Sequence, residues 1–252
     1  RLDSSRVPGK LMLPIDGVSC ILRTYRQVKK CRKAEKVIVV TNSDEIEKEI
    51  RNNGGDTVFM DSDAKCGTDR IIEYLKLRGE IESEICIVQG DQPFLNPDDV
   101  DKCIHLYLTR KFKKTVCTTC HYKIINEDKN DRNVVKVVFD LFGRILYGSR
   151  SLIPFSEDPI VSHYGHKGIF CYDSTYLLST YHRGISRLQH IEDLEWLKIL
   201  EQGFYIESVE IDEPERDLNT WDDYTHLRTK FSCSAGGEFF SEGMVKNFTP
   251  FV

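Results

Sequence analysis

The chain has 252 residues and a mass of 29.2 kDa, so it can bury a substantial core within one α/β domain. Its 40 acidic and 35 basic residues give a formal charge of -5, which argues against a nucleic-acid partner. No apolar run reaches the length of about 18 residues that spans a membrane. The nine scattered cysteines are an odd number, which is typical of reduced thiols, and we expect a cytoplasmic protein.

Short apolar runs alternate with helical patterns in the first part of the chain. Strands are predicted over residues 36–40, 57–60 and 84–89. Helices are predicted over residues 17–30, 68–78 and 97–110, and a further helix is predicted to begin at residue 43. This alternation predicts a Rossmann-like α/β fold, with a mostly parallel sheet covered by helices on both faces. Such a sheet normally begins with a strand, whereas residues 1–5 are loop-like, so we expect the central first strand to be missing from the sequence.

After residue 114 the pattern changes. Residues 134–140 and 145–150 predict a β-hairpin, and residues 166–172 a further strand. This part is predicted to extend the sheet and to carry substrate or dimer contacts.

The end of the chain combines helices with one strand. A stripe of Leu188, Ile191, Leu194, Leu197 and Leu200 predicts one helix, followed by a strand over residues 204–211 and a helix over residues 221–231. We therefore expect a single domain over residues 1–231, with one half over residues 1–114 and a second over residues 115–231, and a loosely ordered tail (232–252).

The first ten residues concentrate positive charge. They read Arg-Leu-Asp-Ser-Ser-Arg-Val-Pro-Gly-Lys. Glycine lets backbone amides approach phosphates closely, and arginine and lysine neutralise their charge. This composition suits a triphosphate, although a solvated basic segment is the plainer alternative.

Three other polar segments lie at the ends of predicted elements. Residues 66–70, Cys-Gly-Thr-Asp-Arg, stand between a strand and a helix, where ligands of α/β sheets bind. Residues 89–93, Gln-Gly-Asp-Gln-Pro, close a buried strand and place Asp91 where a carboxylate can hold a divalent cation. Residues 217–223, Asp-Leu-Asn-Thr-Trp-Asp-Asp, precede the last helix, with Thr220 as its possible cap.

Together these segments resemble, in order, the motifs of the 3-deoxy-D-manno-octulosonate cytidylyltransferases. Similar matches lie at residues 135–140, 147–155, 166–170 and 189–196. The resemblance covers residues 1–230. It implies a nucleotidyltransferase fold with a hairpin subdomain for substrate and dimerisation, a Mg²⁺ cofactor and a homodimer. The implied reaction transfers CMP from CTP to an acidic sugar and releases pyrophosphate.

The resemblance also implies roles for single residues. Catalysis is assigned to Arg1, Lys10 and Asp91. CTP binding is assigned to Arg1, Ser5, Arg6, Gly9, Lys10, Gly67, Thr68, Arg70 and Gln89, with Arg70 at the base. Sugar binding is assigned to Gln92, Arg150, His166, Phe170, Glu192 and Glu195, with Arg150 at the carboxylate. Metal binding is assigned to Asp91, Asp217 and Asn219.

Some residues depart from the family pattern. Asn219 stands where the family has an aspartate, which removes one negative charge from the metal site. Gln92, Phe170, Gln189 and Trp196 also differ. The resemblance makes residues 1–114 the nucleotide-binding half and residues 115–231 the sugar-binding and dimer half, and all of these changes except Gln92 lie in the latter.

The departures leave alternatives open. The acceptor could be an amino-sugar analogue, another nonulosonate-like acid or a phosphonate. A CTP-binding protein without turnover and a glycosyltransferase remain as other classes, although the Pro-Gly-Lys sequence argues against the latter. Residues 117–121, Cys-Thr-Thr-Cys-His, fit a haem-attachment sequence or half a zinc site, but they read as a core strand, and the chain has no second cysteine pair with ligand spacing.

Overall fold

The chain forms two compact units, which are described separately. The computed structural model describes residues 6–62, 64, 66–79, 84–125, 129–158, 160–231 and 249–251. The first unit comprises Arg1–Arg78, Ile87–Asp101 and Glu215–Val252, and the second comprises Gly79–Cys86 and Lys102–Pro214. The expected border at residue 114 lies within the second unit, and the chain returns to the first unit after Pro214.

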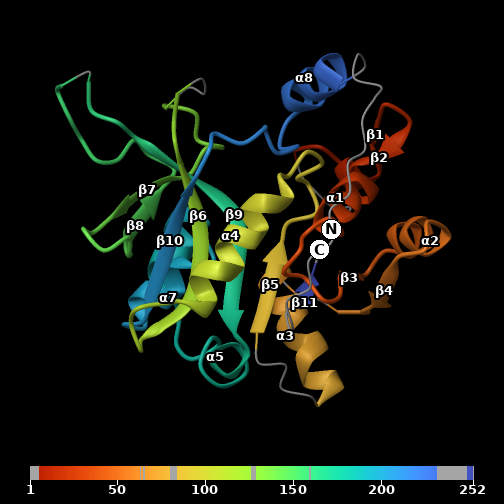
Figure 1. The fold of residues 1–252 in the computed structure, drawn as a ribbon, viewed down its shortest axis with the longest axis horizontal. Coiled ribbons are helices and arrows are strands. Elements are labelled where there is room, and N and C mark those ends of the chain that lie inside the picture. Colours follow the sequence, from red (N-terminus) through yellow and green to blue (C-terminus); the bar gives the residue numbers. More distant parts are fainter. Residues whose placement is uncertain are drawn as a thin grey trace. The chain divides into compact units, whose positions relative to one another are not determined.

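The first unit is built on parallel strands. Its hydrogen-bonded order is β5 (Glu84–Val88), β11 (Thr249–Phe251), β3 (Ile38–Thr41) and β4 (Asp56–Phe59) (Figure 1). Strand β3 runs parallel to both β11 and β4. Its remaining short elements are η1 (Lys10–Met12), β1 (Pro14–Ile15) and β2 (Val18–Ser19). Strand β5 and helix α4 (Pro97–Leu108) contribute residues to both units.

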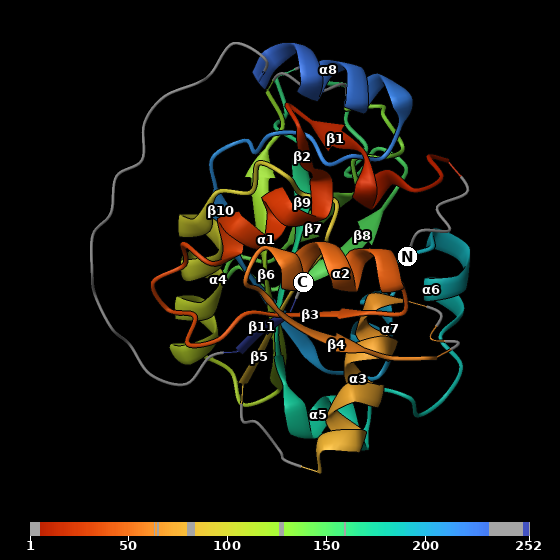
Figure 2. The same cartoon turned by 90° about the vertical axis from the view of Figure 1, so that its right-hand side faces the viewer.

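The helices of this unit begin within one residue of the predicted positions, except the first, which was expected from residue 17 and begins at Cys20. They are α1 (Cys20–Val28), α2 (Asp44–Asn52), α3 (Gly67–Arg78) and α8 (Trp221–Phe231). The side chains of Ser19 and Ser43 accept hydrogen bonds from the amides three residues later and so cap α1 and α2. Acidic residues fill the first turn of α2, which lies alongside β3 and β4 (Figure 2).

The central position of the sheet is filled from the end of the chain. We expected a missing first strand and a loose tail, yet residues 249–251 form β11 between β5 and β3. Every residue of β3 is buried, and a buried strand needs hydrogen-bond partners along both edges. This requirement explains why β11 is ordered. The rest of the tail, residues 232–248 and 252, lies outside the described residues.

The second unit is mainly antiparallel. Its strands are β6 (Thr115–Lys123), β7 (Lys136–Phe139), β8 (Ile145–Ser149), β9 (Tyr164–Asp173) and β10 (Tyr205–Ile211). Strand β6 pairs antiparallel with β9 and parallel with β10. Strands β7 and β8 form the predicted hairpin, and β7 also pairs with β9. The short helix α5 (Ser174–Ser179) follows β9 and was not predicted.

The leucine stripe forms two helices, so the prediction of one helix was wrong. Helix α6 (Arg187–Glu192) ends at Asp193, which has left-handed backbone angles (φ 54°, ψ 46°), and α7 (Leu197–Glu201) begins after Trp196. Aspartate adopts this conformation more readily than most residues. The break allows Leu194 and Trp196 to be buried between the helices. Packing has therefore overridden the helical periodicity.

Cysteines serve mainly as core residues, as expected. Of the described cysteines, all are free thiols and all except Cys66 are buried. The segment 117–121 lies within the buried part of β6, and its Cys117 and Cys120 are fully buried. Among the described residues, no helix is both long and apolar enough to cross a membrane.

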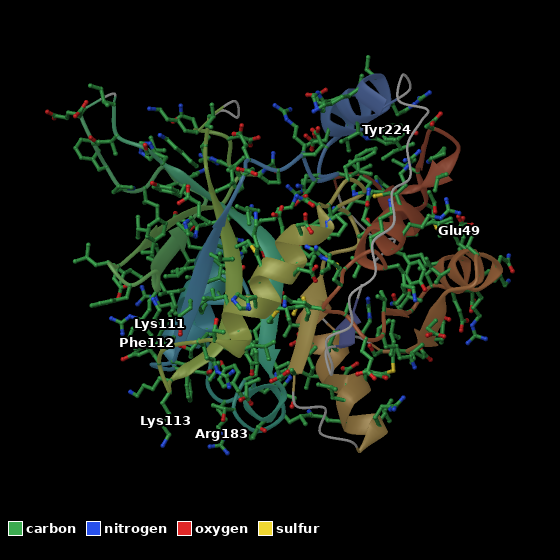
Figure 3. All side chains as sticks on the ribbon, viewed as in Figure 1. Glu49, Lys111, Phe112, Lys113, Arg183 and Tyr224 are labelled. Carbon is green, nitrogen blue, oxygen red and sulfur yellow. The ribbon has the colours of Figure 1, made fainter. Side chains whose placement is uncertain are left out.

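A small core joins α8 to the start of the chain. Ile15, Cys20, Leu218 and Leu227 are fully buried together, and Leu13, Phe94 and Tyr224 pack against them. The hydroxyl of Tyr224, labelled in Figure 3, donates a 2.8 Å hydrogen bond to the carbonyl of Pro14. This core fixes the segment that leads into α8.

Truncation of a side chain in this core tests its contribution. We expect Leu227→Ala to lower the free energy of unfolding by about 2–5 kcal/mol, because it removes buried methyl groups and leaves a cavity. Leu77→Ala in α3 is the matched control, because Leu77 is 76% exposed and its loss should change stability by only about 0.5 kcal/mol. Urea unfolding followed by circular dichroism measures both variants, and equal losses would contradict the assignment.

Candidate active site

An ion pair between Lys10 and Asp91 forms the centre of the site in the first unit. The ammonium of Lys10 donates a 2.5 Å hydrogen bond to Oδ2 of Asp91, and the two side chains are only 13% and 14% exposed. Lys10 opens η1 directly after Gly9, whose φ of 68° favours glycine. Shielding such a pair from water carries a desolvation cost, so removing either partner alone leaves an uncompensated buried charge and is strongly destabilising.

A third segment joins this pair. The ammonium of Lys10 also donates to the carbonyl of Leu218 at 3.0 Å, and the amide of Leu218 donates to the carbonyl of Asp91 at 2.9 Å. Leu218 is fully buried in the core below. The structure therefore brings together Lys10, Asp91 and the backbone of Leu218, which lies between the predicted metal ligands Asp217 and Asn219.

The turn after β5 is packed closely against α1. The hydroxyl of Thr24 donates a 2.9 Å hydrogen bond to the carbonyl of Gly90, and a Cβ at position 90 would lie 2.7 Å from Cδ1 of Ile21. Burial raises the pKa of the Cys20 thiol, and the negative charges of Asp91 and Asp217 raise it further, whereas Lys10 opposes them. The carboxylates of Asp91 and Asp217 therefore both raise the pKa of the same buried thiol.

One carboxylate oxygen of Asp91 could bind a cation. Its Oδ1 is buried and has no hydrogen-bond partner among the described residues. A buried carboxylate oxygen left in this state is destabilising unless a ligand satisfies it. Oxygen donors of this kind are the ligands that Mg²⁺ prefers. The described residues contain no group of three or more His, Cys, Asp or Glu side chains arranged around a metal.

The segment around Asn219 is fixed by a reciprocal cap. Oδ2 of Asp223 accepts hydrogen bonds from the amides of Asn219 and Thr220 and from the Thr220 hydroxyl, at 3.1, 2.8 and 2.8 Å. In return, the Asp223 amide donates to the Thr220 hydroxyl at 3.1 Å, which confirms Thr220 as the cap of α8. The backbone beside the predicted metal ligands is therefore rigidly positioned.

The other residues assigned to CTP vary in exposure. Thr68 and Arg70 in the first turn of α3 are buried, at 0% and 7% exposed, while Gly67 is exposed. Gln89 is exposed, and Gln92, assigned to the sugar, is 1% exposed. Arg6 is exposed, and Arg1 and Ser5 lie outside the described residues.

In the second unit, polar contacts gather on Glu192, the last residue of α6. Its Oε1 accepts hydrogen bonds from the hydroxyls of Tyr147 and Ser149 at 3.1 and 2.8 Å, and its Oε2 accepts one from the Arg150 amide at 3.0 Å. Burial alone would raise the pKa of Glu192, but these hydrogen bonds and the positive charge of Arg150 outweigh it. The pKa of the carboxyl is therefore lowered.

Arg150 is held mainly by backbone carbonyls. Its Nε donates to the carbonyl of Glu192 at 3.1 Å, one terminal nitrogen donates to the carbonyl of Arg132 at 3.0 Å, and the other faces Asp193 at 3.3–3.5 Å. The fully buried Lys136 donates to the carbonyl of Arg150 at 2.8 Å. The structure therefore brings together Arg150 and Glu192, two of the residues assigned to the sugar.

Aromatic rings surround His166. Its Nε2 lies 2.8 Å from the Thr119 hydroxyl, and its ring centroid lies 5.1 and 5.2 Å from those of Phe170 and Trp196. Burial lowers the pKa of His166 to about 3, with smaller contributions from His121 and Lys167, so the ring is neutral at pH 7. Only glycine fits at position 148, because a Cβ there would collide with the Trp196 indole.

The break between the helices changes the expected position of Glu195. The sequence placed Glu192 beside Glu195 and Trp196 on one helix, but Glu195 lies between α6 and α7, so that expectation was wrong. The sequence also gave no role to Lys136, Tyr147 or Ser149. A lysine with no exposed surface is unusual, but its burial becomes apparent only in the structure.

Known proteins are similar to this chain over most of its length. Residues 1–211 match a protein family described as cytidylyltransferase. A protein of Chlorobium limicola named 3-deoxy-manno-octulosonate cytidylyltransferase is 34% identical over 242 residues, covering 94% of this chain and 96% of that protein. An 8-amino-3,8-dideoxy-manno-octulosonate cytidylyltransferase of Shewanella sp. is 36% identical over 228 residues, covering 85% of this chain and 91% of that protein.

A solved structure is also similar. The structure of CMP:2-keto-3-deoxy-manno-octonic acid synthetase complexed with CTP aligns with a TM-score of 0.84 and 25% identity, covering 92% of this chain and 95% of that one. This match confirms the predicted nucleotidyltransferase fold.

The hydrogen bonds to Glu192 predict a pH-dependent stability. The pKa of Glu192 is lower in the folded chain, so its carboxylate stabilises the fold above the ordinary carboxyl range, and this contribution is lost as the pH falls through the lowered pKa. We expect Glu192→Gln to be less stable than the parent at pH 7, with the difference shrinking toward acid pH. Glu210→Gln, an exposed change in β10, is the matched control. Urea unfolding at several pH values measures the difference, and a constant difference would contradict this role.

Proposed function

Because the chain belongs to the cytidylyltransferase family, we propose that it transfers CMP from CTP to 3-deoxy-manno-octulosonate or a close analogue and releases pyrophosphate. The observation that carries this proposal is the buried cluster of Lys10, Asp91 and the Leu218 carbonyl. It places a cation and a carboxylate at the end of a sheet strand, where nucleotide phosphates bind in α/β folds. The names of the relatives support the sugar class.

The reaction needs little covalent chemistry from the protein. The anomeric hydroxyl oxygen of the sugar attacks the α-phosphorus of CTP and loses its proton. The bond from that phosphorus to the bridging oxygen breaks, and pyrophosphate leaves with the bonding electrons. Catalysis in such transfers comes from positioning and from neutralising charge on the phosphates.

In this proposal, cationic side chains of the first unit bind the triphosphate. Lys10 is held in place by two oxygen acceptors, and its strongly charged ammonium can exchange Asp91 for phosphate oxygens. Arg1, Ser5, Arg6 and Gly9 complete the phosphate loop, and Gly67, Thr68, Arg70 and Gln89 serve the nucleoside, with Arg70 at the base. The burial of Thr68 and Arg70 agrees with a site that excludes water.

Mg²⁺ fits the residues of this site. The buried Oδ1 of Asp91 supplies one oxygen ligand, and Asp217 and the side-chain carbonyl of Asn219 are candidates for others. When bound, Mg²⁺ neutralises phosphate charge and lowers the pKa of a coordinated hydroxyl. The protein's own part is to hold Asp91 rigid through the Leu218 amide and the packed turn at Gly90.

The sugar is proposed to bind in the second unit. Arg150 carries a fixed positive charge suited to a carboxylate, and Glu192 with the neutral His166 offers hydrogen bonds to hydroxyls. Phe170 and Glu195 are further contacts of this unit carried over from the family resemblance, which also assigns Gln92 of the first unit to the sugar. We also propose a homodimer that works in the cytoplasm.

The acceptor test uses CTP with Mg²⁺ and separate acceptors: 3-deoxy-manno-octulosonate, its 8-amino analogue, a nonulosonate and a phosphonate. We expect pyrophosphate release with CTP, and not with ATP, GTP or UTP, in the presence of one of the octulosonates. Asp91→Asn should lower kcat/KM by about a hundredfold or more, because it removes the charge of the proposed Mg²⁺ ligand and of the group that holds Lys10. Asp44→Asn, an exposed change in the first turn of α2, is the matched control.

The outcomes separate the two candidate functions. Activity that is equal in Asp91→Asn and Asp44→Asn would refute the proposed site. CTP binding without pyrophosphate release from any acceptor would instead support a CTP-binding protein without turnover, the second candidate, which the loss of charge at Asn219 favours.

Restoring the charge at position 219 tests the metal site. We expect Asn219→Asp to tighten Mg²⁺ binding about tenfold, because a second carboxylate adds a negative charge beside Asp91. Calorimetric titration of Mg²⁺ in the presence of CTP measures this directly, and the Mg²⁺ dependence of pyrophosphate release measures it independently. Asp222→Asn, at an exposed position nearby, controls for general charge effects. Unchanged Mg²⁺ affinity in Asn219→Asp would exclude position 219 as a ligand.

A further inference from the structure

The second unit carries a cluster of positive charge that the proposed function does not use. Residues 111–114, which lead into β6, read Lys-Phe-Lys-Lys, and all three lysines are exposed. Within the described part of the chain, their ammonium groups form no ion pair with a carboxylate. Figure 3 labels Lys111, Phe112 and Lys113 at the edge of this unit. We call residues 111–114 the lysine loop.

A buried carboxylate fixes the backbone of the lysine loop. The side chain of Glu207, in β10, accepts hydrogen bonds from the amides of Lys111 and Phe112 at 3.2–3.4 Å. The Thr115 hydroxyl donates a further hydrogen bond of 2.5 Å to the same carboxylate, which is part of a residue only 2% exposed. The negative charge of Glu207 therefore stabilises the backbone of the loop, while the ammonium groups of the three lysines remain at the surface.

An apolar turn lies beside the lysine loop. The turn between β7 and β8 contains Leu141, which is 99% exposed, and Phe142, which is 63% exposed. The ring centroids of Phe142 and Phe112 lie 6.1 Å apart in an edge-on arrangement. The guanidinium of Arg144 lies over the rings of Phe112 and Tyr205, 4.8 and 4.6 Å from their centroids. These aromatic and cation–π contacts hold the turn and the lysine loop together as one patch.

Hydrogen bonds make the turn rigid. Oδ1 of Asp140 accepts hydrogen bonds from two amides of the turn at 2.8 and 3.0 Å, and its Oδ2 accepts one from Nε of Arg144 at 2.6 Å. The carbonyl of Gly143 accepts a 2.8 Å hydrogen bond from the amide of Ser208 in β10. The negative charge of Asp140 is thus compensated by Arg144, and the charges of the lysine loop are not. Leu141 is held on a fixed backbone with its side chain in water, which is unfavourable unless a partner covers it.

We propose that the lysine loop and the turn with Leu141 and Phe142 form a docking surface for an anionic lipid bilayer. Lysines beside such a surface are attracted to its headgroups, and exposed aliphatic and aromatic side chains enter the interface between headgroups and acyl chains. A symmetric contact between two copies of this patch would bring the two lysine loops together, and their like charges would repel. A nucleic acid would attract the lysines but would offer no apolar cover for Leu141.

Sedimentation with lipid vesicles tests the charged part of the surface. Vesicles of equal parts phosphatidylglycerol and phosphatidylcholine should bind the parent chain at least about tenfold more tightly than vesicles of phosphatidylcholine alone. Glutamine in place of all three lysines should weaken binding to the anionic vesicles by about a hundredfold, because each cation near such a surface contributes about fivefold. This triple variant combines Lys111→Gln, Lys113→Gln and Lys114→Gln.

The matched control makes the same change of charge in the first unit. It replaces three exposed lysines, by Lys29→Gln, Lys30→Gln and Lys36→Gln. We expect the control to bind the anionic vesicles within about threefold of the parent, because charges farther than a Debye length from the surface are screened.

A second pair of variants tests the apolar part. Leu141→Ser should weaken binding to the anionic vesicles by about tenfold, because it removes an aliphatic side chain from the bilayer interface. The fold should tolerate the change, since Leu141 is 99% exposed. Ile185→Ser is the matched control, at a fully exposed position elsewhere in the second unit, and should bind as the parent does.

Other results would overturn the proposal. They are no binding of the parent to anionic vesicles, or equal losses of binding in the lysine variant and its control. A parent dimer that dissociates in Leu141→Ser, without vesicle binding, would assign the patch to contact between two copies. Binding to a single-stranded oligonucleotide or to polyglutamate in place of vesicles would assign it to a nucleic acid or an acidic protein. None of these measurements uses CTP, so they stand apart from the proposed function.

Discussion

The first unit depends on one shielded ion pair, between Lys10 and Asp91. A single ammonium joins a loop near the start of the chain, a turn 81 residues later and a backbone carbonyl 208 residues away. Each contact uses a different oxygen, so the geometry of three segments is set by one charged group. A buried charge without its partner is strongly unfavourable, which makes correct assembly of these segments a condition for a stable first unit.

The second unit uses a carboxylate in a comparable way. Glu192 accepts hydrogen bonds from two hydroxyls and one backbone amide, all contributed by β8 and the residue after it. It can do so because α6 ends at Asp193, whose left-handed backbone turns the chain away from a continuous helix. The broken helix thus serves the polar network, while Trp196 fills the space that Gly148 leaves open. The turn at Asp193 therefore determines both the hydrogen bonds of Glu192 and the packing of Trp196.

The sequence predicted most elements because their signals are local. Apolar runs gave β3 and β5, the start of α2 was expected at residue 43, and the hairpin of β7 and β8 followed from its alternation. Segments 1–10, 89–93 and 217–223 were singled out because they concentrate charge at the ends of elements. The break at Asp193 and the burial of Lys136 were missed, because both depend on packing against distant segments.

The place of β11 shows the limit of that reasoning most clearly. Sequence order led us to expect that the central strand would come first, yet a sheet requires only that each buried edge be paired. The entropy of closing a connection grows slowly with its length, by about 0.6 kcal/mol for each doubling. Strands that are buried on both edges offer hydrogen bonds and apolar contacts that outweigh such a difference. The central strand can therefore be supplied by a segment that lies far along the sequence from the strands beside it.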